Sequence, residues 1–266
     1  MATTTLHGTF VWYELMTTDP PAAESFYSDV VGWGTTPFEG AQIPYTMWLK
    51  DETPIGGLVR IPEGEQANGV TPNWMAHVAV DDVDATAARA KELGGEVLMG
   101  PEDIPNIGRY AVLRDPQGAV ISTFRGTEEM SGTPEQEPGD VSWHELATTD
   151  HESAFRFYSE LFGWEKQEAM DMGEAGVYQM YGLDGHMLGG MYNKSANLPD
   201  ADRNKPQPGP PAWLYYIRVA DLDDSVRKVR ERGGEIVVEP MEVPGGSRIA
   251  VGIDPQGAAF GLHQGA

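Results

Sequence analysis

The chain has 266 residues, a formal net charge of −23 at pH 7 and no cysteine, so disulfides, thiolate metal sites and cysteine nucleophiles are excluded. Its 41 acidic side chains outnumber 18 basic ones, and nucleic-acid phosphates and anionic membranes would repel such a surface. No apolar run approaches the roughly 20 residues that span a bilayer, and residues 1–8 lack the basic start and apolar core of a signal peptide. We therefore expect an acidic cytoplasmic protein that binds neither nucleic acid nor membrane.

The first predicted elements are a strand and a helix. Residues 9–15 are typical of a strand, and Asp19 followed by Pro20 is typical of a helix start, because proline lacks only an N–H that would have no partner there. Gly32 is expected to end this helix. The apolar positions of the helix recur at helical spacing and form one stripe: Ala23, Phe26, Tyr27 and Val30. Three short strands are predicted next, at residues 33–37, 45–49 and 55–61.

The same pattern then restarts. Residues 73–80 predict a strand, Asp82 a helix cap, and residues 83–93 a helix that ends at Gly94-Gly95. Three more strands are predicted, with the turn Asp115-Pro116-Gln117-Gly118 between the last two: residues 96–99, 109–114 and 119–125. Each half of this region is therefore a strand–helix–strand–strand–strand (βαβββ) module.

The second half of the chain repeats the first. Trp12-Tyr13-Glu14-Leu15 returns 131 positions later as Trp143-His144-Glu145-Leu146, and Asp115-Pro116-Gln117-Gly118-Ala119 returns 139 positions later at residues 254–258. The motifs occur in the same order in both copies, and a single insertion explains the change in spacing. This indicates a duplication into tandem domains. We predict domain 1 at residues 8–125 (modules 8–62 and 72–125), a linker at 126–140, and domain 2 at 141–264 (modules 141–194 and 211–264). The insertion is expected in the loop at about residues 192–211.

This order of motifs resembles that of the vicinal oxygen chelate superfamily, which includes glyoxalase I, bleomycin-resistance proteins and extradiol dioxygenases. The resemblance is carried by a Phe-Tyr pair seven residues after the capping Asp, the following Gly-Trp, the Gly-Gly after the second helix, and Asp-Pro-x-Gly before the last strand. Within the superfamily, Trp-x-Glu-Leu and Asp-Pro-Gln-Gly-Ala are similar to a tandem-domain subgroup that includes the mycobacterial 27-kDa antigen and anthracycline-pathway proteins. The resemblance implies an α+β fold of two tandem domains, each a pair of βαβββ modules in an open, cupped mixed sheet around a ligand cavity.

The resemblance also implies a divalent metal held by His, Gln or Glu on the first strands and the last strand of a domain. By the spacing of the family, these positions are occupied by Trp12, Met75 and Ser122 in one copy and by Trp143, Leu214 and Gly261 in the other. None of these side chains suits such a site, so we expect no cofactor. The alternative lies two residues further along, on the same strand face. There a metal would be held by Glu14 and His77 or by Glu145 and His263, each pair one ligand short of a facial triad.

Aromatic side chains are expected to line the cavities. We place Trp48, one of Trp74 and Met75, and one of Trp213 and Tyr215 on or beside the cavity strands, and Trp33 and Trp164 in the core. Aromatic walls suit flat, small molecules. The ligand-binding residues we expect are Trp12, Glu14, Met75, His77, Ser122, Trp143, Glu145, Leu214, Tyr216 and His263.

The expected function is metal-independent binding of a small aromatic metabolite or drug. The alternative is an enzyme of the superfamily (a lyase, isomerase, hydroxylase or dioxygenase), and a third hypothesis is a scaffold that acts through protein contacts. Because burial in an apolar pocket raises the pKa of a carboxylate, Glu14 and Glu145 are candidate catalytic residues, together with His77. His144 is one position out of register and should face away from Glu145. The sequence leaves both a monomer and a homodimer open.

Overall fold

Two eight-stranded mixed sheets carry the fold in the computed structural model, which describes residues 6–40, 43–127, 136–173, 176–194 and 210–266. The first sheet contains β1 (Phe10–Thr17), β2 (Gly34–Pro37), β3 (Tyr45–Lys50), β4 (Thr53–Arg60), β5 (Asn73–Ala79), β6 (Glu96–Ile104), β7 (Gly108–Arg114) and β8 (Val120–Gly126). Its strand order is β2-β3-β4-β1-β5-β8-β7-β6. The β1–β4 and β5–β8 pairs are parallel. The outer strands pair antiparallel, as β2–β3, β3–β4, β6–β7 and β7–β8.

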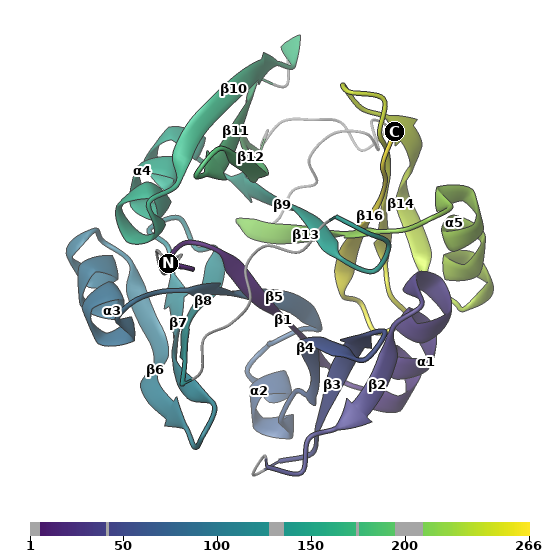
Figure 1. The fold of residues 1–266 in the computed structure, drawn as a ribbon, viewed down its shortest axis with the longest axis horizontal. Helices are drawn as coiled ribbons and strands as arrows, with labels where there is room; N and C mark the ends of the chain where they lie inside the picture. Colours follow the sequence, from purple (N-terminus) through teal and green to yellow (C-terminus); the bar gives the residue numbers. More distant parts are fainter. Residues whose placement is uncertain (1–5, 41–42, 128–135, 174–175, 195–209) are drawn as a thin grey trace, which may run out of the picture. The chain divides into compact units, whose positions relative to one another are not determined.

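The second sheet repeats this topology. Its strands are β9 (Val141–Thr148), β10 (Glu165–Asp171), β11 (Val177–Leu183), β12 (His186–Asn193), β13 (Ala212–Arg218), β14 (Glu235–Glu242), β15 (Arg248–Ile253) and β16 (Ala259–Gln264). The order β10-β11-β12-β9-β13-β16-β15-β14 matches that of the first sheet strand by strand (Figure 1). The predicted α+β class, with βαβββ modules in mixed sheets, is therefore confirmed.

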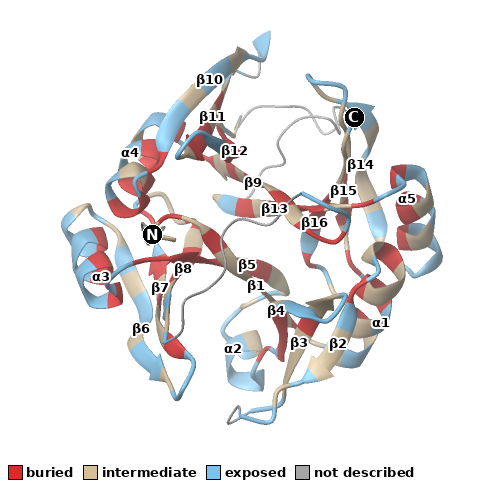
Figure 2. Cartoon of the chain, viewed as in Figure 1, coloured by how far each residue is buried: buried red, intermediate tan, exposed pale blue. Residues whose placement is uncertain are grey.

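Four helices begin after an aspartate, as predicted. The helices are α1 (Pro20–Val31), α3 (Val83–Glu92), α4 (His151–Phe162) and α5 (Leu222–Glu231), and their N-caps are Asp19, Asp82, Asp150 and Asp221. Each carboxylate accepts a backbone N–H of the first turn. The apolar stripe of each helix is buried and the opposite side is exposed (Figure 2). None of the helices in the described ranges is long and apolar enough to cross a membrane.

One short helix, α2 (Glu63–Ala67), was not predicted. It has five residues, none of them buried, so it shows no apolar periodicity that a sequence pattern could detect.

The compact units of the chain do not follow the two copies. Compact unit I consists of Met1–Val11, Ala76–Thr133 and His144–Trp213, and compact unit II of Trp12–Met75, Pro134–Trp143 and Leu214–Ala266. Each unit therefore takes one module from each copy. The predicted domain boundaries stay a prediction, and residues 128–135 of the predicted linker and 195–209 of the predicted loop lie outside the described residues.

In compact unit II, a buried hydrogen-bond chain joins the two copies. The indole of Trp74 donates to the hydroxyl of Tyr27 at 2.9 Å, and that hydroxyl donates to Asp254 at 3.1 Å. The other oxygen of Asp254 accepts three backbone N–H groups of the Asp-Pro-Gln-Gly-Ala turn, at 2.8–2.9 Å. This aspartate is therefore the turn former expected from the sequence, and it also anchors α1.

Compact unit I contains the same chain of contacts. Trp213 donates to Tyr158 at 3.3 Å, and Tyr158 donates to Asp115 at 3.0 Å. Asp115 again closes its own turn through three backbone N–H groups. The Phe-Tyr and Asp-Pro-Gln-Gly-Ala motifs thus recur because they hold one copy to the other.

The tryptophan positions confirm one prediction. Trp33 and Trp164 are buried in the core as predicted, and their indoles donate to the carbonyl oxygens of Gly139 and Gly8. The aromatic residues expected on or beside the cavity strands lie on β3, β5 and β13 and are buried: Trp48, Trp74, Trp213 and Tyr215. Met75 and Tyr216, on the opposite faces of β5 and β13, are buried as well, so burial does not distinguish the two faces. That these rings line a ligand cavity stays a prediction.

Candidate functional site

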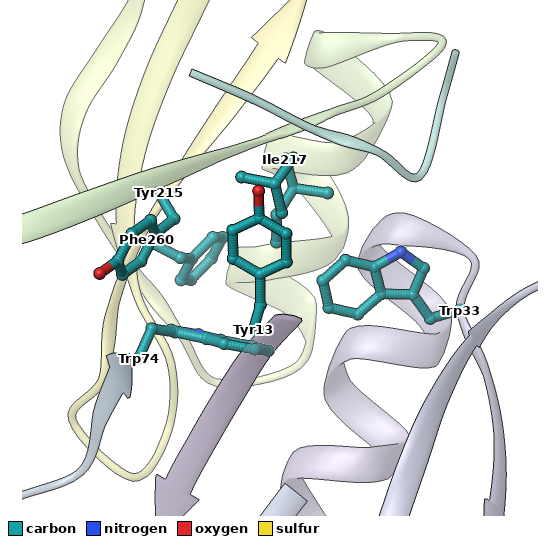
Figure 3. A pocket seen from close by; sticks show the side chains of 7 residues that line it. Tyr13, Trp33, Trp74, Tyr215, Ile217 and Phe260 are labelled. Carbon is teal, nitrogen blue, oxygen red and sulfur yellow. The ribbon is translucent and has the colours of Figure 1, made fainter. Parts of the chain in front are cut away.

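A small gap in compact unit II belongs to the aromatic core. Its lining residues are Tyr13, Trp33, Trp74, Val141, Tyr215, Ile217 and Phe260. Figure 3 shows Tyr13 in the middle of this group, flanked by Trp33 on one side and by Tyr215 and Phe260 on the other. The space left between the rings does not admit a water-sized sphere, so the pocket is packed core. Tyr13 precedes Glu14 on β1, and the two side chains point to opposite faces.

Glu14 lies in a hydrogen-bonded cluster on the other face of β1. The hydroxyl of Tyr45 accepts a hydrogen bond from the indole of Trp12 at 3.0 Å and donates one to the Glu14 carboxylate at 2.9 Å. Gly57, the β4 neighbour of Glu14, makes room for this arrangement, because a Cβ there would overlap the Tyr45 hydroxyl. We call Trp12, Glu14, Tyr45 and Gly57 the Glu14 cluster.

Burial and the hydrogen bond from Tyr45 set the electrostatics of the Glu14 cluster. Burial raises the pKa of Glu14, and the hydrogen bond from Tyr45 partly opposes this effect. Burial and the nearby charge of Glu14 raise the pKa of Tyr45, so its hydroxyl stays protonated and remains a donor. Tyr45 is the only hydrogen-bond partner of the Glu14 carboxylate among the residues that the structure describes. Glu14 is half-buried and can accept a further hydrogen bond.

Glu145 is held in the same way in compact unit I. The hydroxyl of Tyr178 donates to the Glu145 carboxylate at 2.9 Å. Gly190 on β12 is the neighbour of Glu145 on β9, and a Cβ at Gly190 would overlap the ring of Tyr178. The ring of Tyr192 stacks on that of Tyr178, with centroids 5.9 Å apart and planes at 17°. We call Glu145, Tyr178, Gly190 and Tyr192 the Glu145 cluster.

Sequence reasoning missed the three tyrosines of these clusters. Tyr45 and Tyr178 lie on β3 and β11, whereas the spacing of the family directed attention to the first and last strands of each module. A signal was present, because Tyr45 and Tyr178 are separated by 133 positions, as are Gly57 and Gly190. Tyr192 has no such signal, because the equivalent residue of the first copy is Val59.

The two histidines proposed as partners of the glutamates lie in other surroundings. His77 belongs to compact unit I, whereas Glu14 belongs to compact unit II. Glu145 belongs to compact unit I, whereas His263 belongs to compact unit II. His77 is 7% exposed, burial lowers its pKa to about 4, and its Nε2 has no hydrogen-bond partner among the described residues. The Nδ1 of His263 lies 2.7 Å from the hydroxyl of Ser142. Burial, followed by the charge of Arg218, lowers the pKa of His263.

The other expected ligand-binding residues vary in exposure. Trp12, Trp143 and Leu214 are half-buried, whereas Met75 and Tyr216 are buried. Ser122 is fully buried, and its hydroxyl donates to the carbonyl oxygen of Ala111 at 3.1 Å.

His144 faces away from Glu145, as predicted. Its Nδ1 lies 2.7 Å from the carbonyl oxygen of Leu188, and its ring stacks on Phe10 with centroids 3.7 Å apart.

Comparison with known proteins identifies the family. Residues 9–123 and 141–262 match the family model of the Glyoxalase/Bleomycin resistance protein/Dioxygenase superfamily. The chain belongs to this superfamily. CFP32 of Mycobacterium tuberculosis is 31% identical over 258 residues, which cover 96% of this chain and 94% of that protein. The anthracycline biosynthesis protein DnrV of Streptomyces peucetius is 29% identical over 270 residues, with 96% and 92% covered.

Solved structures of the superfamily share the fold. The 2,2',3-trihydroxybiphenyl 1,2-dioxygenase of Sphingomonas wittichii strain RW1 has a TM-score of 0.68 at 11% identity, and 97% of this chain and 91% of that one are covered. The Mn(II)-bound glyoxalase of Novosphingobium aromaticivorans has a TM-score of 0.61 at 17% identity, with 98% and 83% covered. At these identities the likeness shows the fold alone. The resemblance inferred from the sequence motifs is therefore confirmed at the level of family and fold.

The residues of this chain do not fit a superfamily metal centre. Within the described ranges, no three His, Asp or Glu side chains come close enough together to hold a metal ion. The positions given by the spacing of the family carry Trp12, Met75 and Ser122 in one copy, and the hydroxyl of Ser122 is already used by the main chain. Indole, thioether and an occupied hydroxyl are poor donors for a hard or borderline divalent ion. We therefore derive no chemical step through a metal.

Proposed function

We propose that the protein binds a small planar aromatic molecule, without a metal, at the Glu14 cluster and the Glu145 cluster. The observation that carries this proposal is their shared design. In each copy a half-buried glutamate is oriented by a tyrosine hydroxyl at 2.9 Å, and a glycine on the neighbouring strand makes room for the tyrosine. Carboxylates placed among aromatic rings suit a ligand that is flat and carries a hydrogen-bond donor.

The chemistry of the clusters restricts the ligand. A carboxylate only accepts hydrogen bonds, so the ligand must offer an O–H or N–H group, as a phenol, an enol or an amine does. The net charge of −23 disfavours anionic ligands. A relative named for anthracycline biosynthesis supports this ligand class, because anthracyclines are planar phenolic molecules.

A second candidate function is an enzyme of the superfamily that uses Glu14 as an acid–base group. The raised pKa of Glu14 favours this alternative, because a carboxyl group that gains a proton more readily is a better acceptor for proton transfer. A binder and such an enzyme differ in turnover: the enzyme converts the bound molecule and the binder returns it unchanged.

The test is a calorimetric titration of the purified protein with an anthracycline, with tryptophan quenching as a second readout. Glu14→Gln and Glu145→Gln each remove one charged acceptor, and each should weaken its site about tenfold or more. Glu165→Gln, at an exposed residue of β10, is the matched control and should bind as the wild type does. Absence of binding, or wild-type affinity in the E14Q/E145Q double variant, would overturn the proposal. Conversion of the anthracycline would favour the enzyme.

A further inference from the structure

The Glu145 cluster contains one group that the Glu14 cluster lacks. Tyr192 pairs with Tyr178 across β12 and β11, and the equivalent residue Val59 pairs with Tyr45 across β4 and β3. Val59 is buried and apolar, whereas Tyr192 is half-buried and carries a hydroxyl. The two clusters therefore differ by one aromatic ring and one polar group.

The hydroxyl of Tyr192 is unused by the protein in the described ranges. Its ring is fixed by stacking on Tyr178, but no hydrogen bond to its hydroxyl occurs among these residues. The hydroxyl is not one of the buried polar atoms that lack a partner among these residues, so it is accessible to a partner from outside the chain. The neighbour of Tyr192 on β9 is Ala147, which lies two residues after Glu145 and on the same strand face.

Tyr192 lies close enough to Glu145 to interact with its charge. Burial first, and then Glu145, raise the pKa of Tyr192, so the hydroxyl stays protonated and acts as a donor. Glu145 is an acceptor held by Tyr178 at 2.9 Å. The cluster thus offers a ligand one acceptor and one donor on the same sheet face.

We propose that Tyr192 donates a hydrogen bond to a carbonyl oxygen of the ligand whose hydroxyl donates to Glu145. The Glu145 cluster then selects planar hydroxyaryl ketones over simple phenols, whereas the Glu14 cluster, with Val59, does not distinguish them. This inference rests on the proposed function and adds the substrate class and the residue that selects it.

The experiment uses two neutral probes of one skeleton. 7-Hydroxy-1-tetralone carries a hydroxyl and a carbonyl on one edge, and 5,6,7,8-tetrahydro-2-naphthol lacks the carbonyl. Both are titrated by calorimetry into the full chain carrying Glu14→Gln, which isolates the Glu145 cluster. Tyr192→Phe removes the hydroxyl and keeps the stacked ring. This substitution should lower the affinity for the ketone about fivefold, since one neutral hydrogen bond is lost. It should lower the affinity for the phenol less than about twofold.

Tyr178→Phe is the matched control, because it removes the group that orients Glu145 and should weaken both probes alike. Equal affinity of the two probes before substitution, or equal losses on Tyr192→Phe, would overturn the inference. If both probes bind and Glu145→Gln weakens both, while Tyr192→Phe affects neither, the proposed function stands and the role of Tyr192 falls. If neither probe binds, both fall.

Discussion

The hydroxyl of Tyr27 donates a hydrogen bond of 3.1 Å to Asp254, which lies 227 positions further along the chain. Tyr158 makes the equivalent bond of 3.0 Å to Asp115, so each copy supplies the tyrosine to one compact unit and the aspartate to the other. The most obvious repeated motifs are therefore structural. The chemistry of the clusters rests on less obvious residues, Tyr45 and Tyr178.

Tyr27→Phe should destabilise the protein by about 2 kcal/mol. The substitution removes the buried hydrogen bonds that the Tyr27 hydroxyl makes with Asp254 and with the indole of Trp74. Such losses lower the free energy of unfolding by about 1–3 kcal/mol. Tyr158→Phe should have a similar effect. Urea unfolding followed by tryptophan emission measures both, and a loss below about 0.5 kcal/mol in each would contradict this role.

Gly57→Ala should disrupt the Glu14 cluster. Its Cβ would overlap the hydroxyl of Tyr45, so Tyr45 must move and its hydrogen bond to Glu14 is lost. We expect a destabilisation of about 1–3 kcal/mol and a loss of anthracycline affinity at this site.

Gly64→Ala is the control for that substitution. Gly64 lies in α2, and a Cβ there would meet no atom within 4 Å. Because alanine favours the helix, the protein should be unchanged or up to about 1 kcal/mol more stable in urea unfolding. If both glycine variants behaved alike, the close fit of Tyr45 on Gly57 would not matter.

Protonation of buried histidines should lower stability in mild acid. Burial lowers the pKa of His77 and of His144 from 6.5 to about 4, so the folded protein holds them neutral while the unfolded chain binds protons. The stability from each imidazole is therefore complete above pH 6.5 and is lost as the pH falls toward 4. Between pH 6.5 and 5 the loss is about 2 kcal/mol per histidine. His77→Phe should reduce the pH dependence of urea unfolding by that amount, and an unchanged dependence would contradict the burial of a neutral His77.

Ligand binding at the Glu14 cluster should weaken as the pH falls. Burial raises the pKa of Glu14, so its carboxylate is protonated at a higher pH than an exposed glutamate and then accepts hydrogen bonds less well. In the Glu145→Gln background, which isolates this site, anthracycline affinity measured from pH 8 to pH 5 should decline. In the E14Q/E145Q double variant the residual affinity should not vary with pH over this range. The same decline in both would assign the effect to other groups.

Much of the fold could be predicted from the sequence, because its signals are local. Aspartate caps and glycine stops placed four helices, and the order of motifs indicated the family. The short helix α2 has no buried face and gave no signal. The combination of modules from both copies in each compact unit depends on contacts such as Tyr27 with Asp254, which no local pattern encodes.

The candidate site could be predicted in part. The period of two correctly separated Glu145 from His144, because strand faces alternate whatever the sheet packs against. The hydrogen-bond partners of the glutamates were missed, because Tyr45 and Tyr178 lie on β3 and β11. Their side chains reach the glutamates through the space above Gly57 and Gly190. A glycine that makes room for a distant side chain is visible only once the strands are paired.

The central claim is that a planar phenolic ligand is bound by oriented glutamates and not by a metal. The most direct measurement is the dissociation constant of an anthracycline for protein treated with a chelator, before and after addition of Mn²⁺, Fe²⁺ or Zn²⁺. The account predicts the same affinity in every case, and its loss in the E14Q/E145Q double variant. Binding that appears only when one of these ions is added would contradict it.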